Sequence, residues 1–524
     1  MTRQSSAGVS PDLFDPRPQR VDQRVGQREE DLSDLAASDA AEHDSPPRPA
    51  ERAQNRIFHH AIEATFIAAI FLAVAGFGGT EPVSWAISQD LIFLLAAALL
   101  LHRPELNADR KESPDRTGCT GKNLPALLIL ASLVIWVVAQ WLGSRYGVIG
   151  VDSYAIKARG LAFAAGIAGF FVALEISRHR AARKRLALSL IGLALFESLY
   201  GLAEYPGGWQ YIWTYHRIYY TGSATGTYIN HNHFAGLLEM ILPLCLALAL
   251  YHWRRASHHS RQRSFRDFLD RLGHPEILKS LVLLLVAVLL FVAIVFSLSR
   301  MGLVSALFSL AVLAALASVG RRFGRVNWKL LAACLAIGAA ITVWIGAGPV
   351  VDHFARLSHD EPLAAETSEG RVAEWKSVAK LIRLHPWTGV GLGCFEFAFT
   401  RVQSTQLTLI ADHAHNDYLE LAAELGIPAA GVFFSLVFFV VVRAARAALR
   451  AQSSLTRSNF SPSNLERALT IGAVAAASAL LVHSAADFNF YIPANALVFA
   501  VLLGMAYSHC LIDGHYEVSV GREV

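Results

Sequence analysis

Long apolar runs constrain this chain more than any other feature of its sequence. About twelve of them follow one another, each close to the roughly 17–25 residues that a helix needs to cross a bilayer. Charged residues make up only 17% of the 524 residues, against about a quarter in an average soluble domain. We therefore predict an all-α, polytopic membrane protein. The expected spans are 58–77, 83–101, 124–142, 159–176, 186–204, 232–252, 280–298, 303–319, 330–347, 427–442, 468–485 and 494–511.

Lysine and arginine are distributed unevenly over the loops that join these spans. Every second loop is basic, and the basic loops are 103–122, 178–185, 254–271, 321–329 and 443–450. Because cytoplasmic loops carry an excess of these residues, we expect both termini in the cytoplasm and an even number of spans. The other loops then form the non-cytoplasmic face.

Composition divides the chain into four expected segments. Residues 1–56 are rich in Pro, Arg, Gln, Asp and Ser, which predicts a disordered cytoplasmic tail and not a cleavable signal peptide. Residues 57–205 hold the first spans, 206–512 form a membrane domain with a long outer loop at 348–426, and 513–524 form a cytoplasmic tail. The five cysteines include no C-x-x-C pair, so we expect neither a disulfide nor a cysteine metal site.

Two outer loops are too long to be simple connections. Residues 205–229 carry a series of tyrosines and tryptophans, which suits either stacking on sugar rings or an aromatic belt at the membrane interface. Residues 348–425 include a helical-looking stretch at 371–384 and several Trp and Phe residues. We expect this second loop to fold as a cap over the spans.

Two arginines on this outer face are candidates for a site. Arg300 lies at a tight turn between two spans, where an arginine departs from the charge asymmetry of the loops; its alternative role is to extend its charge to the lipid headgroups. Arg371 and Trp375 are four residues apart and share one face of the predicted helix. The alternative for Arg371 is a surface ion pair with Glu369 or Glu374.

The stretch 412–420 contains two histidines two residues apart, His413 and His415, flanked by aspartates. Such a pair suits a metal site, and a neutral histidine equally suits a general base. A third interpretation is a helix N-terminus capped by Asn416 or Asp417. The spacing alone does not separate the three.

Several weaker candidates lie near the same face. Asn232 is in a polar stretch that opens the sixth span, and Glu197, Glu204 and Glu239 are ionisable residues within or near spans, where such groups face the protein interior or a cavity. The glycines of 389–393 lack the strand–helix context of a dinucleotide-binding fingerprint, and we expect a tight turn there.

Taken in chain order, these motifs resemble the O-antigen ligase and O-antigen polymerase superfamily, from about residue 205 to the last span. Family members carry a histidine followed by Asn, Ser or Gln, with a glycine further along. Here His415-Asn416 is followed by Gly426, and Ala429 stands where Gly, Thr or Tyr is usual. Three further segments resemble the arginine turn, the large periplasmic loop and the stretch before the final span of that family, at 299–300, 370–391 and 487–495.

The resemblance implies an all-helical membrane glycosyltransferase of the GT-C kind in a bacterial inner membrane. It would move a glycan from a polyprenyl-diphosphate carrier to an acceptor hydroxyl on the periplasmic face, with inversion and without metal, cofactor or nucleic acid. By this resemblance the catalytic residues are His415, Arg300 and Arg371. The expected substrate contacts are Asn416, Trp375, Asn232, Tyr418 and Glu239.

Three other functions are compatible with parts of the sequence. An O-antigen or exopolysaccharide polymerase shares the chemistry but uses a lipid-linked glycan as acceptor. A lipid or sugar transporter predicts internal repeats and broken spans near the bilayer midplane, and no clear repeat is present. A metal-dependent hydrolase would use Asp412, His413 and His415 and would need a further ligand.

Overall fold

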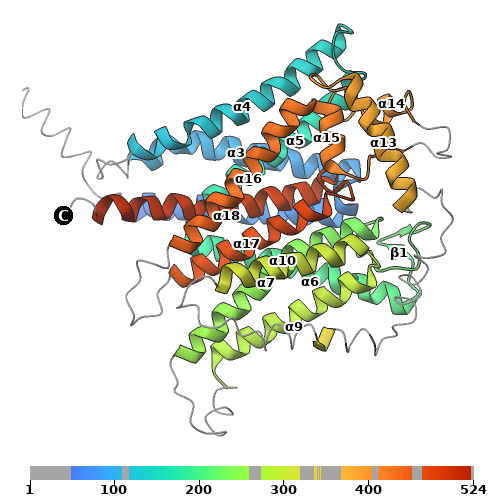
Figure 1. The fold of residues 1–524 in the computed structure, drawn as a ribbon. Coiled ribbons are helices and arrows are strands. Elements are labelled where there is room, and N and C mark those ends of the chain that lie inside the picture. Colours follow the sequence, from blue (N-terminus) through green and yellow to red (C-terminus); the bar gives the residue numbers. More distant parts are fainter. Residues whose placement is uncertain are drawn as a thin grey trace, which may run out of the picture. The chain divides into compact units, whose positions relative to one another are not determined.

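Helices form nearly all the regular elements of this chain in the computed structural model (Figure 1). The structure describes residues 49–108, 117–258, 273–318, 336–338, 340, 343, 368–403, 411–450 and 463–520. Residues 58–524 form one unit and residues 1–57 another, of which 49–57, the first residues of α2, are described.

The elements follow one another along the chain in two halves. The first half consists of α2 (Pro49–Ala75), η1 (Phe77–Gly79), α3 (Pro82–Ala108), α4 (Thr117–Arg145), α5 (Ser153–Ile176), α6 (Arg180–Gly207), β1 (Tyr211–Ile212), β2 (Tyr215–His216), α7 (His231–His258), α9 (Pro275–Phe296) and α10 (Arg300–Ser318). The second half consists of α13 (Ser368–Leu384), α14 (Phe395–Phe399), α15 (Asp417–Leu425), α16 (Ile427–Arg450), α17 (Ser463–His483), η3 (Asn489–Tyr491) and α18 (Pro493–Val520).

Eleven of the described helices are long and apolar enough to cross a membrane. They coincide with every expected span except 330–347, most of which lies outside the described residues. The prediction of an all-α, polytopic membrane protein is confirmed. Of the expected tails, residues 1–48 and 521–524 lie outside the described residues, and α18 continues as a helix through Val520.

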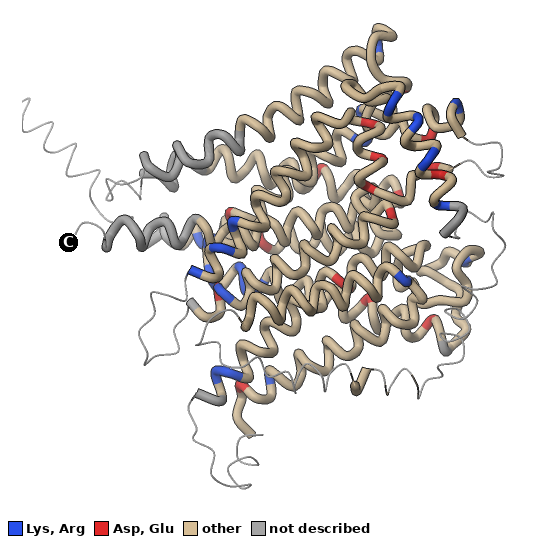
Figure 2. The backbone as a smooth tube through the Cα atoms, in the orientation of Figure 1, with Lys and Arg blue, Asp and Glu red and all other residues tan. Residues whose placement is uncertain are grey.

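Charged residues gather toward the two ends of the helical bundle, and the stretch between them is largely uncharged (Figure 2). This is the distribution that a bilayer requires, because its hydrocarbon core does not solvate charge. The glutamates expected near the spans, Glu197, Glu204 and Glu239, are all fully buried inside the protein. None of the three faces lipid.

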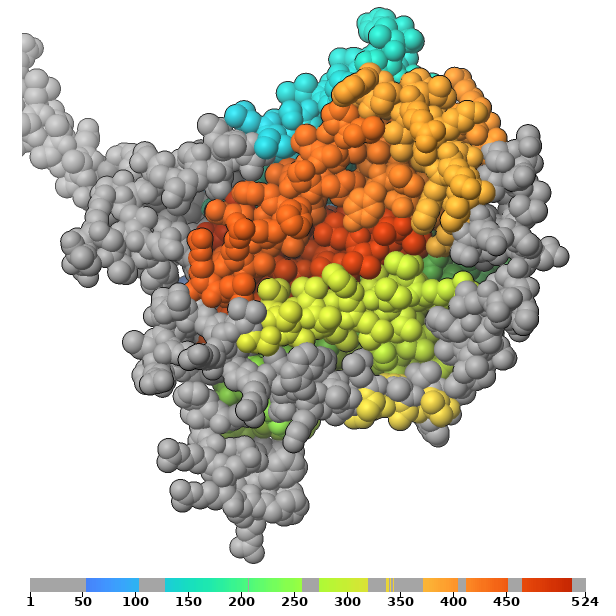
Figure 3. All heavy atoms as spheres, in the orientation of Figure 1, coloured from blue at the N-terminus to red at the C-terminus, as the bar shows by residue number. Residues whose placement is uncertain are grey.

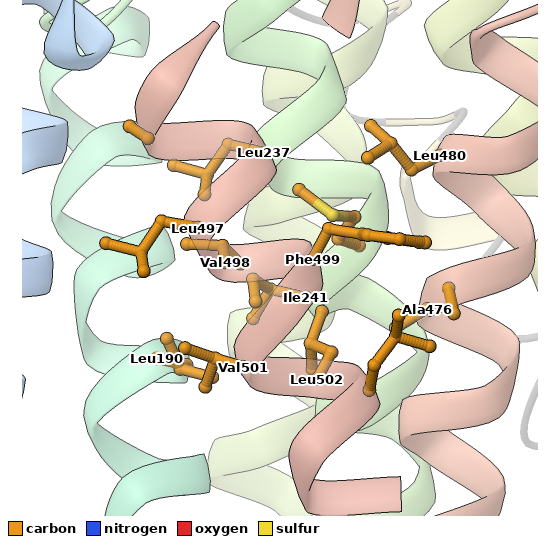
Figure 4. Packing of buried hydrophobic residues seen from close by; sticks show 14 of the residues in the cluster. Leu190, Leu237, Ile241, Ala476, Leu480, Leu497, Val498, Phe499, Val501 and Leu502 are labelled. Carbon is orange, nitrogen blue, oxygen red and sulfur yellow. The ribbon is translucent and has the colours of Figure 1, made fainter. Parts of the chain in front are cut away.

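The spans differ in how far they are covered by protein. The α7 span is entirely buried, packed against α9, α10 and α17, whereas the α4 span leaves most of its residues exposed. The centre of the bundle is built from branched and aromatic side chains of α6, α7, α17 and α18 (Figure 4). α7 is therefore the central helix, and α4 presents its apolar surface to lipid.

Small residues allow the central helices to approach closely, as is common between membrane helices. A Cβ atom added to Gly472 of α17 would lie 3.0 Å from the Cα atom of Leu244 in α7, and one added to Gly504 of α18 would lie 2.5 Å from the carbonyl oxygen of Phe170 in α5. These contacts hold α17 against α7 and α18 against α5 within the bundle.

We use the term site end for the end of the bundle where α6, α9 and α17 finish and α7, α10 and α18 begin. The helix predicted at 371–384 is confirmed as α13, which lies at this end together with α14 and α15 (Figure 1). In the space-filling view, α13 is the gold element beside the orange α16 (Figure 3). The long outer loop thus contributes folded structure above the spans, as expected.

Candidate active site at one end of the bundle

One face of α13 is fastened to the segments that carry the histidines. The indole Nε1–H of Trp375 donates to the carbonyl oxygen of Ala414 at 3.0 Å, and Nη1 of Arg371 donates to the carbonyl oxygen of Ala486 at 2.8 Å. Residues three and four apart share a helix face, which explains why both contacts come from one side of α13. The predicted pairing of Arg371 and Trp375 on one face is therefore confirmed.

His415 lies next to this attachment point. Its Nδ1 atom is 3.5 Å from Oε2 of Glu374, and its side chain is 24% exposed. Its backbone has φ +45°, in the left-handed region that is uncommon outside glycine. Burial lowers the pKa of His415, but the carboxylates of Glu374 and Asp487 raise it by more, so the pKa lies above its usual value. Backbone strain and a shifted pKa on an accessible side chain are features of functional sites.

The second histidine, His413, is held differently. Its Nδ1 atom lies 2.7 Å from Oε1 of Glu420, and its ring stacks on Phe488 at 4.1 Å. Burial lowers the pKa of His413 to about 4 and raises the pKa of Glu420 to about 8. Both shifts favour the neutral forms of His413 and Glu420, which share this hydrogen bond. The two histidines have different carboxylate partners and different protonation behaviour.

Asn416 uses both ends of its side-chain amide on backbone groups. Its Oδ1 accepts from the N–H groups of Tyr418 and Leu419 and so caps α15, and its Nδ2 donates to the carbonyl oxygen of Ala485 at 2.8 Å. The interpretation of 412–420 as a capped helix N-terminus is confirmed, with Asn416 as the cap. The hydroxyl of Tyr418 donates to the carbonyl oxygen of Leu481 at 2.6 Å. Substrate contact by either residue remains a prediction.

Asp487 lies between two buried histidines. Its carboxylate oxygens are 3.5 Å from Nε2 of His483 and 3.8 Å from Nε2 of His233, and Nδ1 of His483 lies 3.0 Å from Glu239. Burial raises the pKa of Asp487, but the two histidines lower it by more, so the pKa lies well below its usual range and the group stays ionised. Glu239 is fully buried in this chain of contacts, and its predicted contact with substrate gains no support from this position.

Arg300 is the first residue of α10, at the site end. Ser299 caps the helix, since its Oγ accepts from the N–H of Gly302 at 3.1 Å, and a Cβ added to Gly302 would lie 2.6 Å from Ala235 of α7. This close approach places the start of α10 beside the start of α7, where Asn232 is half-buried. The structure thus brings Arg300 and Asn232 to the same end of the bundle as His415.

Several buried polar side-chain atoms at this end have no hydrogen-bond partner within the described part of the chain. They include Nε of Arg300, Nε of Arg371, Oε1 of Glu374 and Nδ1 of His415. Most buried polar groups in proteins are hydrogen-bonded, and exceptions call for an explanation. Two guanidinium groups with free donors suit a ligand that carries negatively charged oxygens.

Sequence reasoning missed several polar residues of the site. Arg159 of α5 donates to the carbonyl oxygen of Tyr491 at 2.8 Å and lies over the ring of that tyrosine, whose hydroxyl donates to Glu424 at 2.6 Å. Like Arg300, Arg159 is an arginine on the face that is otherwise poor in Lys and Arg, and this departure from the charge pattern could have identified it as a candidate. Glu374 and Asp487 were within motifs that the sequence singled out, but neither was assigned to the site.

The predicted turn at 389–393 is present and packs against the end of α15. Gly389, Gly391 and Gly393 all have positive φ, and the N–H groups of Val390 and Gly391 donate to the carbonyl oxygens of Ala423 and Glu424. A Cβ on Gly389 would lie 2.1 Å from the Glu424 carbonyl oxygen. Glycine is required there by both space and backbone conformation.

No group of three His, Cys, Asp or Glu side chains with the geometry to hold a metal ion occurs among the residues that the structure describes. The metal-hydrolase alternative would need His413 and His415 to share an ion. Their Nδ1 atoms instead face Glu420 and Glu374, respectively.

The fold and the site define an all-helical, multi-pass membrane protein with a polar site at one end of its helices. Residues 285–434 match the family model described as O-Antigen ligase (Wzy_C). No curated protein matches the chain. The matched segment contains Arg300, Arg371 and His415, and the match supports a membrane enzyme of the O-antigen ligase or polymerase type.

Proposed function

We propose that this protein transfers a glycan from a polyprenyl-diphosphate carrier to an acceptor hydroxyl on the periplasmic face of a bacterial inner membrane. The observation that carries the proposal is the position of His415: an accessible imidazole in a strained backbone conformation, with a carboxylate at Nδ1 and Arg371 on the same helix as that carboxylate. This arrangement lies within the segment matched to the O-antigen ligase family.

In the proposed reaction the anomeric carbon of the donor sugar changes partners. The bond between this carbon and the diphosphate oxygen breaks, and a bond to the acceptor oxygen forms on the opposite side, with inversion. Nε2 of His415 takes the proton from the acceptor hydroxyl, a contribution of about 10²–10⁴-fold to the rate. The diphosphate leaves with the electron pair of the broken bond.

The leaving diphosphate gains negative charge in the transition state, and we assign its stabilisation to Arg300 and Arg371. Guanidinium groups match phosphate oxygens in geometry, and fixed positive charge in a partly buried site stabilises developing negative charge more than water does. Both side chains are half-buried, and each has a buried Nε without a partner among the described residues. Each donor therefore remains available for a phosphate oxygen.

The position of the site also suits a lipid carrier. Arg300 begins α10 and His415 precedes α15, and both lie at the site end, which is the depth proposed for the diphosphate of a membrane-embedded polyprenyl chain. A substrate of this kind would reach the site from the bilayer and not from solution.

The test is glycan transfer in reconstituted vesicles that contain a polyprenyl-diphosphate glycan donor, with EDTA present throughout. We expect His415→Ala, Arg300→Ala and Arg371→Ala to lose activity at matched expression. Arg383 and Arg401 are exposed arginines of the same outer segment, and their alanine variants are the controls. Parent-like activity in the three site variants would contradict the assignment, and loss of the parent's activity to EDTA would contradict a metal-independent reaction.

A further inference from the structure

The geometry of the contact between Glu374 and His415 determines which imidazole nitrogen is free to act as a base. Oε2 of Glu374 lies 3.5 Å from Nδ1 of His415, so the carboxylate is behind the ring and Nε2 is on the opposite side. The distance is longer than a direct hydrogen bond, and such contacts in free enzymes commonly tighten when substrate binds. With a side chain only 3% exposed, Glu374 has few other positions to adopt.

Two further contacts hold this arrangement in place. The Trp375 indole is bonded to the carbonyl of Ala414, the residue before His415, and Arg371 is bonded to the carbonyl of Ala486. Glu374 lies between them on α13, so the helix cannot slide or rotate without breaking one of these bonds. The carboxylate is therefore presented to His415 by a helix that is fixed on both sides.

A neutral histidine exists in two tautomers, and only one of them can act as the proposed base. A carboxylate at Nδ1 favours the tautomer with the proton on Nδ1, which leaves the lone pair of Nε2 free to accept a proton. It also stabilises the imidazolium that forms after proton transfer. Without the carboxylate both tautomers are populated, and the imidazolium loses its nearest counter-charge.

We infer that Glu374 is the positioning residue for His415, which fixes its tautomer and orientation so that Nε2 faces the acceptor hydroxyl. This inference rests on the proposed function, since it assumes that His415 is the base. In the step itself, the acceptor proton moves to Nε2 while the Nδ1 proton stays on the imidazole, shared with Glu374. The carboxylate touches neither substrate.

Charged groups other than Glu374 also shift the pKa of His415, and the expected effect of a Glu374 variant depends on the sum of these shifts. Glu374 and Asp487 favour its protonated form, whereas Arg371 disfavours it, and the charge of His415 in turn disfavours protonation of His413. Removing only the charge of Glu374 therefore leaves Asp487 as the remaining anion and Arg371 as an opposing cation. We expect the pKa of His415 to fall in that variant.

The experiment compares Glu374→Gln and Glu374→Asp with the parent in the vesicle assay across pH. We expect Glu374→Gln to lower kcat at least about tenfold, but by less than loss of the base itself, which contributes about 10²–10⁴-fold, with little change in KM. The acid limb of its rate profile should move to lower pH. Glu374→Asp retains the charge and should recover part of kcat and the position of the limb. Glu396→Gln, at an exposed glutamate of α14, is the matched control.

The outcomes separate this inference from the proposed function. A parent-like kcat and acid limb in Glu374→Gln, with His415→Ala inactive, would overturn the role of Glu374 and leave the base assignment intact. Full activity in His415→Ala would overturn the base assignment itself. An equal loss in Glu374→Gln and Glu374→Asp, with an unchanged acid limb, would mean that Glu374 only supports the fold. In the His415→Ala background, Glu374→Gln should cause no further loss.

Discussion

Trp375 donates its indole N–H to the carbonyl oxygen of Ala414 at 3.0 Å, and this bond joins α13 to the residue that precedes His415. The two residues lie on different elements, and the bond is one of the contacts that hold the segment around His415 against α13. The predicted contact of Trp375 with substrate remains a prediction.

Replacing Trp375 by Phe removes the donor and keeps most of the ring. A hydrogen bond of this kind contributes about 0.5–1.5 kcal/mol, so we expect a small loss of thermal stability in detergent and a larger loss of kcat, because His415 is no longer held. Trp387→Phe is the control, since Trp387 is 75% exposed. Equal, parent-like kcat values in both variants would show that this bond does not position the base.

The two histidines should respond differently to substitution. His413 is neutral at ordinary pH and bonded to Glu420, so His413→Gln, whose amide can still hydrogen-bond to that carboxyl, should retain substantial activity. His415→Gln should reduce transfer by about 10²–10⁴-fold, the contribution of a general base. Both variants are measured in the same vesicles at equal protein. A reversed order of activities would assign the base to His413.

The rate of transfer by the parent should rise with pH through the pKa of His415. The base must be neutral to accept a proton, and Glu374 and Asp487 outweigh burial and raise this pKa above the ordinary value, which is about 6.5. The acid limb of kcat/KM, which reports the free enzyme, should therefore have its midpoint above about 6.5. A midpoint below that value would show that the neighbouring carboxylates do not control the group that limits the rate.

Asp487→Asn should destabilise the protein strongly. Asp487 is ionised and lies between His483 and His233, and removing one partner of a buried charged pair costs about 3–5 kcal/mol. The folded pKa of Asp487 is depressed, so its contribution is present at pH values above the pKa of an unfolded aspartate, about 3.9, and is lost as pH falls through the folded value. The measurement is the thermal midpoint in detergent at pH 7, and an unchanged midpoint would contradict the prediction.

Gly389→Ala should weaken the attachment of the 389–393 turn to α15. The new Cβ would lie 2.1 Å from the carbonyl oxygen of Glu424 at a backbone φ of +64°, so the cost should exceed the 0.4–1 kcal/mol by which such a change at a compatible site stabilises. Gly431→Ala in α16 is the control, because a Cβ there has no neighbour within 4 Å. It should be neutral or slightly stabilising. Similar midpoints for the two variants would argue against the turn being tightly packed.

The sequence was sufficient for the class of fold because span length and hydrophobicity follow directly from the bilayer. It was also sufficient for the order of the motifs, and α13 begins three residues before the predicted start. Which side chains pair with one another at the site could not be predicted from the sequence in the same way. Glu374 is as compatible with Arg371 as with His415 on spacing alone, and only the attachment of α13 through Trp375 decides between them.

The buried contacts of Asp487 could not be predicted from the sequence, for a different reason. His233 and His483 lie at the ends of two apolar spans that are distant in sequence, and no local pattern indicates that these ends meet. Their proximity depends on how α7 and α17 pack, which small residues such as Gly472 make possible.

Asn416 holds the first turn of α15 with one end of its amide and the carbonyl of Ala485 with the other. A genetic screen that scores only loss of glycan transfer would therefore group Asn416 with His415, although loss of the Asn416 amide also removes two attachments to the backbone. Variants at Asn416 can be told apart by their heat sensitivity, because a lost cap costs about 0.5–2 kcal/mol of stability. In a His-Asn pair of this kind, the asparagine fixes the backbone next to the histidine by capping the helix that follows.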